Sequence, residues 1–301
     1  IIGFVLGSCI AALFFKEFRA RSGSSPLVRF VLGVFAMIGA LVFLGCPWRA
    51  LLRLAGGDWN AIFGILGLAV GVFAGTLFFR GGYDLGRSNS NRTGAGWIMP
   101  LIMLGFLALM FIFPQVPGEP KSGVLFYSVK GPGSMHAPLL VSLVVGLAVG
   151  FAAQRSRFCT MGALRDLFLF RQTHLFMGIV GLALAAFVTN LILGQFKPGF
   201  AGQPVAHTMG IWNFAGMALA GLAFALAGGC PGRQLFLAGE GDGDAGIFVL
   251  GMITGAAISH NFGLASSPAG VGPYGIPGVI IGFLVCIFIG FAMRKRSAVA
   301  S

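Results

Sequence analysis

The feature that most constrains this chain is the recurrence of apolar runs about as long as a lipid bilayer is thick. A transmembrane helix needs about 20 mainly apolar residues. The runs that meet or approach this length are residues 1–15, 27–44, 61–79, 97–113, 137–153, 175–194, 211–227, 245–264 and 276–293. They predict an all-α polytopic membrane protein with about nine transmembrane helices.

Composition excludes the main soluble alternatives. Hydrophobic residues make up 57% of the chain and charged residues 9%, whereas an average soluble protein is roughly 25% charged. So few charges cannot cover a water-soluble surface, which excludes a cytosolic enzyme and a disordered chain. The net charge of +12 does not indicate nucleic-acid binding, because the basic residues fall in short connections between the apolar runs.

The distribution of Lys and Arg predicts the orientation. When connections are assigned alternately to the two sides, one side receives 15 basic residues, including those after the last run, and the other receives five. Cytoplasmic loops carry the excess of Lys and Arg, so we predict a cytoplasmic C-terminus. The first run is short and begins at Ile1 without a charged flank. We interpret this as a missing natural start, with a cleaved signal peptide as the less favoured alternative.

An internal repeat surrounds two cysteines. Gly45-Cys46-Pro47-Trp48-Arg49-Ala50-Leu51 returns as Gly229-Cys230-Pro231-Gly232-Arg233-Gln234-Leu235, at an offset of 184 residues and without a gap. From residue 45 to 71 the two copies share 11 identities in 27 positions. Matching by chance in a chain rich in Gly, Leu and Ala does not produce such an ungapped motif.

The spacing of the copies predicts an inverted repeat. Five predicted spans separate them, and because five is odd the second copy lies upside down relative to the first. This arrangement is common in transporters. We predict one integral membrane domain made of a first repeat, 1–136, incomplete at its N-terminus, and a second repeat, 137–301. The stretch after each cysteine, such as 46–56, is too short to span and predicts a re-entrant half-helix.

The motif itself predicts a helix start. Proline is favoured at the first helical position, so Pro47 and Pro231 place the preceding Cys46 and Cys230 at N-caps. The preceding glycines, Gly45 and Gly229, allow a ligand close to the backbone. Arginine in the first turn opposes the helix dipole. The guanidinium groups of Arg49 and Arg233 therefore have another task, either attracting an anion or pairing with a carboxylate such as Asp58 or Asp242.

A thiol beside free backbone N–H groups at the positive end of a helix suits a small anion that carries polarisable sulfur or selenium. The third candidate is Cys159, flanked by Arg157 and Arg165. The alternative for all three cysteines is simple packing between helices. Packing is our interpretation of Cys9 and Cys286, which lie inside apolar runs.

These segments resemble the YeeE/YedE family of membrane proteins, which includes thiosulfate uptake proteins, and are closest to its selenium-associated YedE branch. The stretches that carry the resemblance are Gly45-Cys46-Pro47, Arg157-Phe158-Cys159, Gly162-Ala163-Leu164-Arg165-Asp166, Gly228-Gly229-Cys230-Pro231, Arg233-Gln234-Leu235, Leu237-Ala238-Gly239-Glu240-Gly241 and His260-Asn261-Phe262-Gly263-Leu264-Ala265-Ser266-Ser267-Pro268.

The resemblance implies a pseudo-symmetric helical fold in which re-entrant helices meet at a constriction. It also implies that Cys46, Cys159 and Cys230 hand a sulfur anion along by weak S–H···S contacts. Two departures stand out. The family's first cysteine segment is absent, and Leu44 stands where the second copy has Gly228.

The remaining polar residues carry weaker expectations. His260 and Asn261 are either functional groups at membrane depth or a cap at the end of a span. Glu240, Asp242 and Asp244 lack the spacing of a calcium loop and are expected in a solvated cytoplasmic turn. The four histidines, among them His136 and His207, have no ligand-spaced partners, so we predict no metal and no cofactor.

We therefore predict a bacterial inner-membrane transporter or channel, not an enzyme, for uptake of a small sulfur- or selenium-containing anion. One alternative is a membrane thiol protein that transfers sulfur or selenium to a soluble carrier. Another is a scaffold that docks such a carrier. The expected partners are the anion, membrane lipid and, on the cytoplasmic side, a small sulfur-carrier protein, with no nucleic acid.

Overall fold

A computed structural model of the chain describes residues 1–116, 118–129, 134 and 137–295. The chain divides into two compact units. Unit 1 comprises Ile1–Gly23, Ser88–Arg157 and Gly232–Gly246, and unit 2 comprises Ser24–Arg87, Phe158–Pro231 and Ile247–Ser301. Each unit contains segments from both predicted repeats, whose division at residue 136 stays a prediction.

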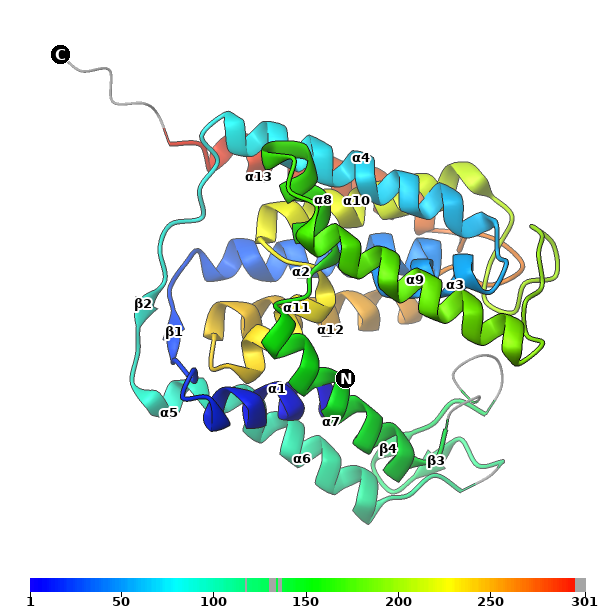
Figure 1. Cartoon of the computed structure of the whole chain (residues 1–301), viewed down its shortest axis with the longest axis horizontal. Coiled ribbons are helices and arrows are strands. Elements are labelled where there is room, and N and C mark those ends of the chain that lie inside the picture. The colour runs from blue at the N-terminus through cyan, green and yellow to red at the C-terminus, as the bar shows by residue number, and fades with distance from the viewer. Residues whose placement is uncertain (117, 130–133, 135–136, 296–301) are drawn as a thin grey trace. The chain divides into compact units, whose positions relative to one another are not determined.

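The regular secondary structure of the described residues is almost entirely helical (Figure 1). Unit 1 holds α1 (Ile2–Phe14), α5 (Thr93–Gly96), α6 (Ile98–Ile112), α7 (Leu139–Ser156) and the two-residue strands β1 (Arg21–Ser22), β2 (Asn89–Ser90), β3 (Lys121–Ser122) and β4 (Leu125–Phe126). Unit 2 holds α2 (Pro26–Phe43), α3 (Pro47–Ala55), α4 (Asn60–Arg80), α8 (Thr160–Phe170), α9 (His174–Ile192), α10 (Gly210–Ala227) and α13 (Gly275–Ala292). The unit boundaries fall within α11 (Pro231–Gly239) and α12 (Gly243–Asn261).

The predicted all-α membrane architecture is confirmed. Seven helical stretches of the described chain are long and apolar enough to cross a membrane, three of them with a short helix appended. The other two predicted spans, 1–15 and 97–113, coincide with α1 and α6, which are apolar but only 13 and 15 residues long. The number nine therefore stays a prediction.

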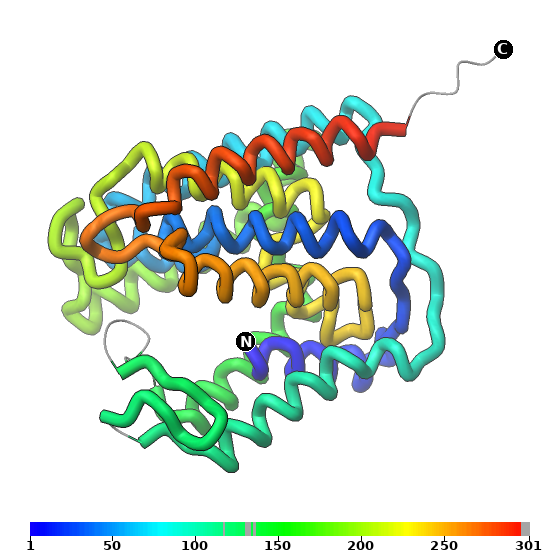
Figure 2. The backbone as a smooth tube through the Cα atoms, turned by 180° about the vertical axis from the view of Figure 1, so that it is seen from behind, coloured from blue at the N-terminus to red at the C-terminus, as the bar shows by residue number. Residues whose placement is uncertain are grey.

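In unit 2 the helix α10 forms the centre of the packing. Every residue from Gly216 to Ala227 is buried, and α10 packs against α2, α4 and α13. Gly67 and Gly71 of α4 face the α10 backbone so closely that a Cβ atom would overlap it. Such small-residue contacts let membrane helices approach each other. Seen from behind, α12 and α13 flank α2 (Figure 2).

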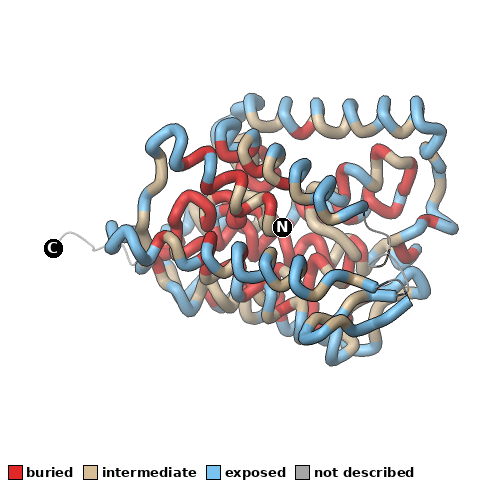
Figure 3. The backbone as a smooth tube through the Cα atoms, turned by 90° about the horizontal axis from the view of Figure 1, so that it is seen from below, coloured by how far each residue is buried: buried red, intermediate tan, exposed pale blue. Residues whose placement is uncertain are grey.

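The outer helices of unit 2 have the opposite character. The buried residue of α9 is Ile179, whereas Leu184, Val188 and Ile192 are exposed. Figure 3 shows exposed residues along the outward faces of the helices and buried residues gathered between them. Large apolar side chains on an outward helix face are those expected to contact lipid.

In unit 1 the helix α1 lies against α7 and α6. Gly3 and Gly7 of α1 contact the backbone at Gly146 and Leu147 of α7, and a side chain at either glycine would collide with it. The hydroxyl of Ser8 donates a 2.7 Å hydrogen bond to the carbonyl of Phe236. α1 thus links α7 to α11, the short helix that follows Cys230.

Candidate functional site

The three candidate cysteines share one local construction. Each follows a long helix that ends at a left-handed residue two positions before the cysteine, and each immediately precedes a short helix. The left-handed residues are Leu44 with φ 66°, Arg157 with φ 55° and Gly228 with φ 86°. Left-handed residues commonly end helices. Here they direct the chain so that each cysteine begins a new helix.

The predicted helix starts are confirmed. Cys46 is the N-cap of α3 with Pro47 at its first position, and Pro231 likewise opens α11. The carbonyl of Cys46 accepts the first helical hydrogen bond, from Ala50 N, at 2.9 Å. Gly45 lies against the side chain of Arg49, where a Cβ atom would come within 3.1 Å of Cδ.

The backbone of the two motif copies matches well beyond the cysteines. Gly57 and Gly241 both have φ of 96°. The equivalent hydrogen bonds are Gly45 N to Ala40 O at 2.9 Å and Gly229 N to Phe224 O at 3.0 Å, then Asp58 N to Arg53 O and Asp242 N to Leu237 O, both at 3.0 Å. The sequence repeat is therefore a repeat of local structure. Its inversion across the membrane stays a prediction.

The three thiols come together in unit 2, around Cys230. Cys159 and Cys230 are buried and share a side-chain hydrogen bond. Cys159 Sγ also accepts hydrogen bonds from Gly162 N at 3.2 Å and from Cys230 N at 3.5 Å. Half-buried Cys46 interacts electrostatically with Cys230. Cys159 and Cys230 are therefore in contact, and Cys46 is linked to Cys230 by electrostatic interaction.

Sequence reasoning selected Cys159 but missed its role as the N-cap of α8. No proline marks the first position of α8, which is Thr160. The apolar run from Leu167 to Phe170 was the available signal. Cys9 and Cys286, expected to be packing residues, are buried inside α1 and α13.

The prediction that Arg49 and Arg233 pair with Asp58 or Asp242 is wrong. Asp58 pairs with Arg53, Nε to Oδ2 at 2.6 Å, because Arg53 lies in the last turn of α3 and reaches the following loop. Arg49 is exposed, and its side chain has no hydrogen bond or ion pair with the described residues. The remaining alternative from the sequence, attraction of an anion, stays open for Arg49.

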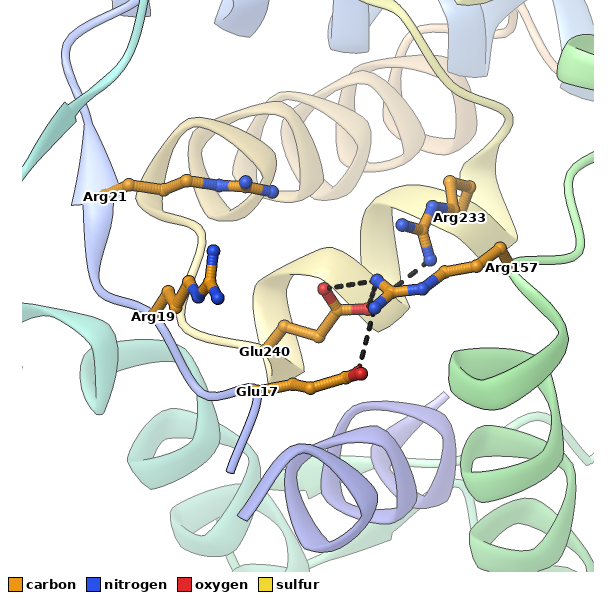
Figure 4. Close-up of a pocket in the computed structure, with 6 residues that line it drawn as sticks. All are labelled: Glu17, Arg19, Arg21, Arg157, Arg233 and Glu240. Carbon is orange, nitrogen blue, oxygen red and sulfur yellow. Dashed lines mark hydrogen bonds and ion pairs between the residues drawn. The ribbon is translucent and has the colours of Figure 1, made fainter. Parts of the chain in front are cut away.

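In unit 1 the other arginines line a cavity of about 270 Å³, which we call the arginine pocket (Figure 4). Its six lining residues are all charged: Glu17, Arg19, Arg21, Arg157, Arg233 and Glu240. Arg157 donates to both carboxylate oxygens of Glu240 at 3.1 Å and to Glu17 at 2.8 Å. Arg233 pairs with Glu240 at 3.4 Å instead of with Asp242. The fourth predicted arginine, Arg165, is not one of the lining residues and pairs with Asp166 at 2.8 Å.

The expectation of a solvated acidic turn is also wrong. Glu240, Asp242 and Asp244 are 6%, 9% and 2% exposed. Buried carboxylates require partners. Asp242 accepts from Arg21 Nε at 2.7 Å, and Asp244 accepts from Gly23 N at 2.9 Å. Their partners lie more than 200 residues away in the sequence, where local spacing gives no signal.

Glu17 is a further site residue that the sequence did not indicate. Gln154 Nε2 donates to it at 2.7 Å and Arg155 at 3.1 Å. The hydrogen bond from Gln154, supported by the charges of Arg157 and Arg155, lowers the pKa of Glu17 below its ordinary 4.5. The carboxylate is therefore held ionised at the edge of the arginine pocket.

The histidines divide into exposed and buried. His260 and Asn261 are exposed, and Asn261 Nδ2 donates to the carbonyl of Ala257 at 2.8 Å, which favours a cap at the end of α12. His207 is buried, with Nε2 2.8 Å from the carbonyl of Val42. His136 lies outside the described residues. Where the structure describes the chain, no three His, Cys, Asp or Glu side chains form a metal-binding group.

Comparison with known proteins points to one class. Residues 155–293 match a family model described as sulphur transport, a range that includes Cys159 and Cys230. Over 111 residues the chain is 31% identical to the thiosulfate transporter TsuA of Escherichia coli (strain K12). This match covers 36% of the chain and 30% of that transporter.

Proposed function

We propose that this chain is a member of the YeeE/YedE family that moves a small sulfur-containing anion, such as thiosulfate, inward across a membrane, a proposal supported by the match of residues 155–293 to a sulphur-transport family model. The observation that carries the proposal is the contact of thiols at helix starts in unit 2. Cys230 interacts with both Cys159 and Cys46. A family match alone gives the class of substrate but no path for it.

Electrostatics explains why helix starts are used. A dianion within a membrane protein loses its hydration and needs compensating positive charge. Each helix N-terminus presents free N–H groups and roughly half a positive charge. At the start of α8 one such N–H, that of Gly162, already points at a sulfur atom, Cys159 Sγ. A sulfur-containing anion placed at these helix starts meets the same donors.

The thiols supply selectivity for sulfur. A neutral thiol is a weak donor and its sulfur a weak acceptor, so it binds the polarisable terminal sulfur of thiosulfate without trapping it. We propose the order Cys46, Cys230, Cys159, because Cys46 is half-buried and Cys159 is buried against Cys230. The ligand passes by exchange of S–H···S contacts, and no covalent bond forms.

The orientation belongs to the same proposal. Excess Lys and Arg in alternate connections supports a cytoplasmic C-terminus in a bacterial inner membrane. Cys46 is then reached from outside. A selenium-containing analogue has the same charge and a softer terminal atom, so it is proposed as a second substrate. A small sulfur-carrier protein is the proposed recipient in the cytoplasm.

Uptake by cysteine variants tests the function. Cells carrying Cys46→Ala, Cys230→Ala or Cys159→Ala are expected to lose uptake of radiolabelled thiosulfate at unchanged membrane levels of the protein. Cys286→Ala is the matched control, since Cys286 is buried inside α13 of the same unit, and it should retain uptake. Undiminished uptake by both Cys46→Ala and Cys230→Ala overturns the proposal.

Two further measurements separate transport from the alternatives. Purified protein in liposomes without any soluble partner should accumulate thiosulfate, whereas a scaffold for a carrier should not. Intact mass spectrometry after exposure to thiosulfate should show an unmodified chain. A mass increase that disappears in Cys159→Ala or Cys230→Ala contradicts the non-covalent relay and supports a sulfur-transfer protein.

A further inference from the structure

The arginine pocket of unit 1 holds more guanidinium groups than its carboxylates require. Four arginines and two glutamates line it. Glu240 and Glu17 are satisfied by Arg157, with additional ion pairs from Arg233 to Glu240 and from Arg155 to Glu17. Each buried or half-buried carboxylate thus already has two cationic partners. The other two arginines of the pocket are not needed to neutralise either glutamate.

Arg19 is the clearest surplus. It is exposed, and its side chain makes no hydrogen bond or ion pair with any residue that the structure describes. Its backbone is nevertheless fixed, because its N–H donates to the carbonyl of Glu240 at 2.9 Å. Figure 4 shows its guanidinium turned into the same space as those of Arg21, Arg157 and Arg233. The backbone of Arg19 is thus held in place beside the pocket, while its guanidinium has no partner among the described residues.

Arg21 contributes in part. Its Nε is engaged by Asp242 at 2.7 Å, and no described residue accepts from its two terminal nitrogens. A guanidinium carries five N–H donors in a planar fork that matches oxyanion geometry. Arg19 and Arg21 therefore provide two guanidinium groups from positions separated by one residue, the second of them at the start of β1.

We propose that the arginine pocket is a binding site for a divalent oxyanion, held by Arg19 and Arg21. The cavity of about 270 Å³ equals the volume of about nine water molecules at ~30 Å³ each, which accommodates a sulfate-sized anion with some of its hydration. Glu17 and Glu240 keep Arg157 in place and moderate the affinity, so that an anion can leave again.

Thiosulfate is itself a divalent oxyanion, so the pocket could bind the substrate of the proposed function. Only this link to thiosulfate rests on the proposed function. Arg157 and Arg233 stand two residues before Cys159 and three after Cys230 in the chain. Each of these two arginines therefore belongs to the same stretch of sequence as one of the thiols. The arginine pocket binds the oxygen atoms of an oxyanion and does not require a terminal sulfur atom. Sulfate, which has no terminal sulfur atom for the thiols to bind, therefore tests the pocket separately from the thiol relay.

Sulfate binding to the full chain tests the site. Protein in phosphatidylcholine nanodiscs is titrated with sulfate by calorimetry at low ionic strength. Arg19→Gln is expected to raise the dissociation constant for sulfate by about tenfold or more, because a charged hydrogen-bonding group is lost. Arg19→Lys, which keeps the charge, should raise it by less. Arg92→Gln is the matched control, an exposed arginine of unit 1 without a described side-chain partner, and should bind like the unaltered chain.

Cys46→Ala separates this proposal from the transport proposal. It should bind sulfate normally whether or not it transports thiosulfate, so failure of the relay does not affect the outcome. Absence of sulfate binding, or equal binding by Arg19→Gln and the unaltered chain, overturns the site. Nanodiscs containing phosphatidylglycerol distinguish the source of the ligand. If the affinity for sulfate is the same with and without phosphatidylglycerol, the site binds a free anion. If phosphatidylglycerol abolishes the sulfate binding that depends on Arg19, the same site is occupied by a lipid phosphate.

Discussion

The two Gly-Cys-Pro-x-Arg segments share a backbone and differ in what surrounds it. Both preceding helices end in a left-handed residue, and both segments close with a glycine at φ 96° and an aspartate that accepts a hydrogen bond from the next helix start. In the first copy Arg49 has no described partner and Asp58 pairs with Arg53 of the same segment. In the second copy Arg233 pairs with Glu240, and Asp242 with the distant Arg21.

This difference separates what the motif fixes from what it leaves free. Backbone geometry is set by residues within the segment, namely the left-handed residue, the proline and the glycine. The charge partners are set by whichever chain packs nearby. The first copy therefore keeps its motif arginine available to a ligand, whereas the second copy uses its arginine to neutralise a buried glutamate.

The largest expected effect comes from the aspartates. The Arg53–Asp58 pair is 9% and 6% exposed, and removing one partner of a buried pair costs about 3–5 kcal/mol. Asp58→Asn should therefore destabilise the protein strongly, as measured by thermal unfolding in detergent. Asp242→Asn should cost about 1 kcal/mol, because Arg21 is 41% exposed and water can solvate it. Equal losses of stability in Asp58→Asn and Asp242→Asn would contradict the difference between the two copies.

The motif arginines should differ in the kind of effect. Arg49→Gln is expected to raise the KM for thiosulfate uptake by about tenfold, the loss of a charged contact to the anion, while the unfolding temperature stays constant. Arg233→Gln should lower the unfolding temperature, at a cost of about 1–2 kcal/mol, because it removes a partner of buried Glu240. Arg49→Lys, which keeps the charge, should raise the KM by less than Arg49→Gln does. An unchanged KM for Arg49→Gln assigns Arg49 no contact with substrate.

The left-handed position gives a smaller effect. Leu44 and Gly228 adopt the same backbone region, which costs a non-glycine residue about 1–2 kcal/mol. No atom lies within 4 Å of a Cβ built on Gly228, so Gly228→Ala should cost about 1 kcal/mol by conformation alone. The first copy tolerates leucine there, and Gly228→Ala should accordingly fold and keep its uptake. A loss well above that value, measured by thermal unfolding, indicates a packing role for Gly228.

Local features of the fold were predictable from the sequence. The apolar runs 61–79 and 211–227 match α4 and α10 to within one residue at each end, because hydrophobic length directly reports a membrane helix. Pro47 and Pro231 gave the helix starts at Cys46 and Cys230 for an equally local reason. The start of α8 at Cys159 has no such marker and was missed.

The electrostatic partners were not predictable. Glu17 and Arg157 are 140 residues apart, and Arg21 and Asp242 are 221 apart. Each pair forms only because helix packing brings two loops together, and no spacing rule reports it. The buried acidic turn at Glu240 looked solvated for the same reason. A single sequence therefore indicated the thiols but not the pocket that the arginines form.

The smallest expected effect is a pH dependence that differs between the surroundings of the two copies. His207 lies beside the helix that leads to Cys46, where Nδ1 accepts from Met209 N at 3.3 Å and Nε2 contacts the carbonyl of Val42. Burial lowers the pKa of His207 below its ordinary 6.5, with Arg53 assisting and Asp58 opposing. Glu17, in the arginine pocket, has a pKa below 4.5 because of Gln154 and its arginines.

Both groups bind protons more readily in the unfolded chain, so each contributes stability that is complete above its unfolded pKa and is lost as the pH falls through its folded pKa. The unfolding temperature should thus decline in two stages on acidification. The first begins below about 6.5, from His207, and the second below about 4.5, from Glu17. His207→Gln should flatten the first stage alone and Glu17→Gln the second alone. Thermal unfolding between about pH 8 and about pH 3 measures both stages, and a first stage that persists in His207→Gln assigns it to another group.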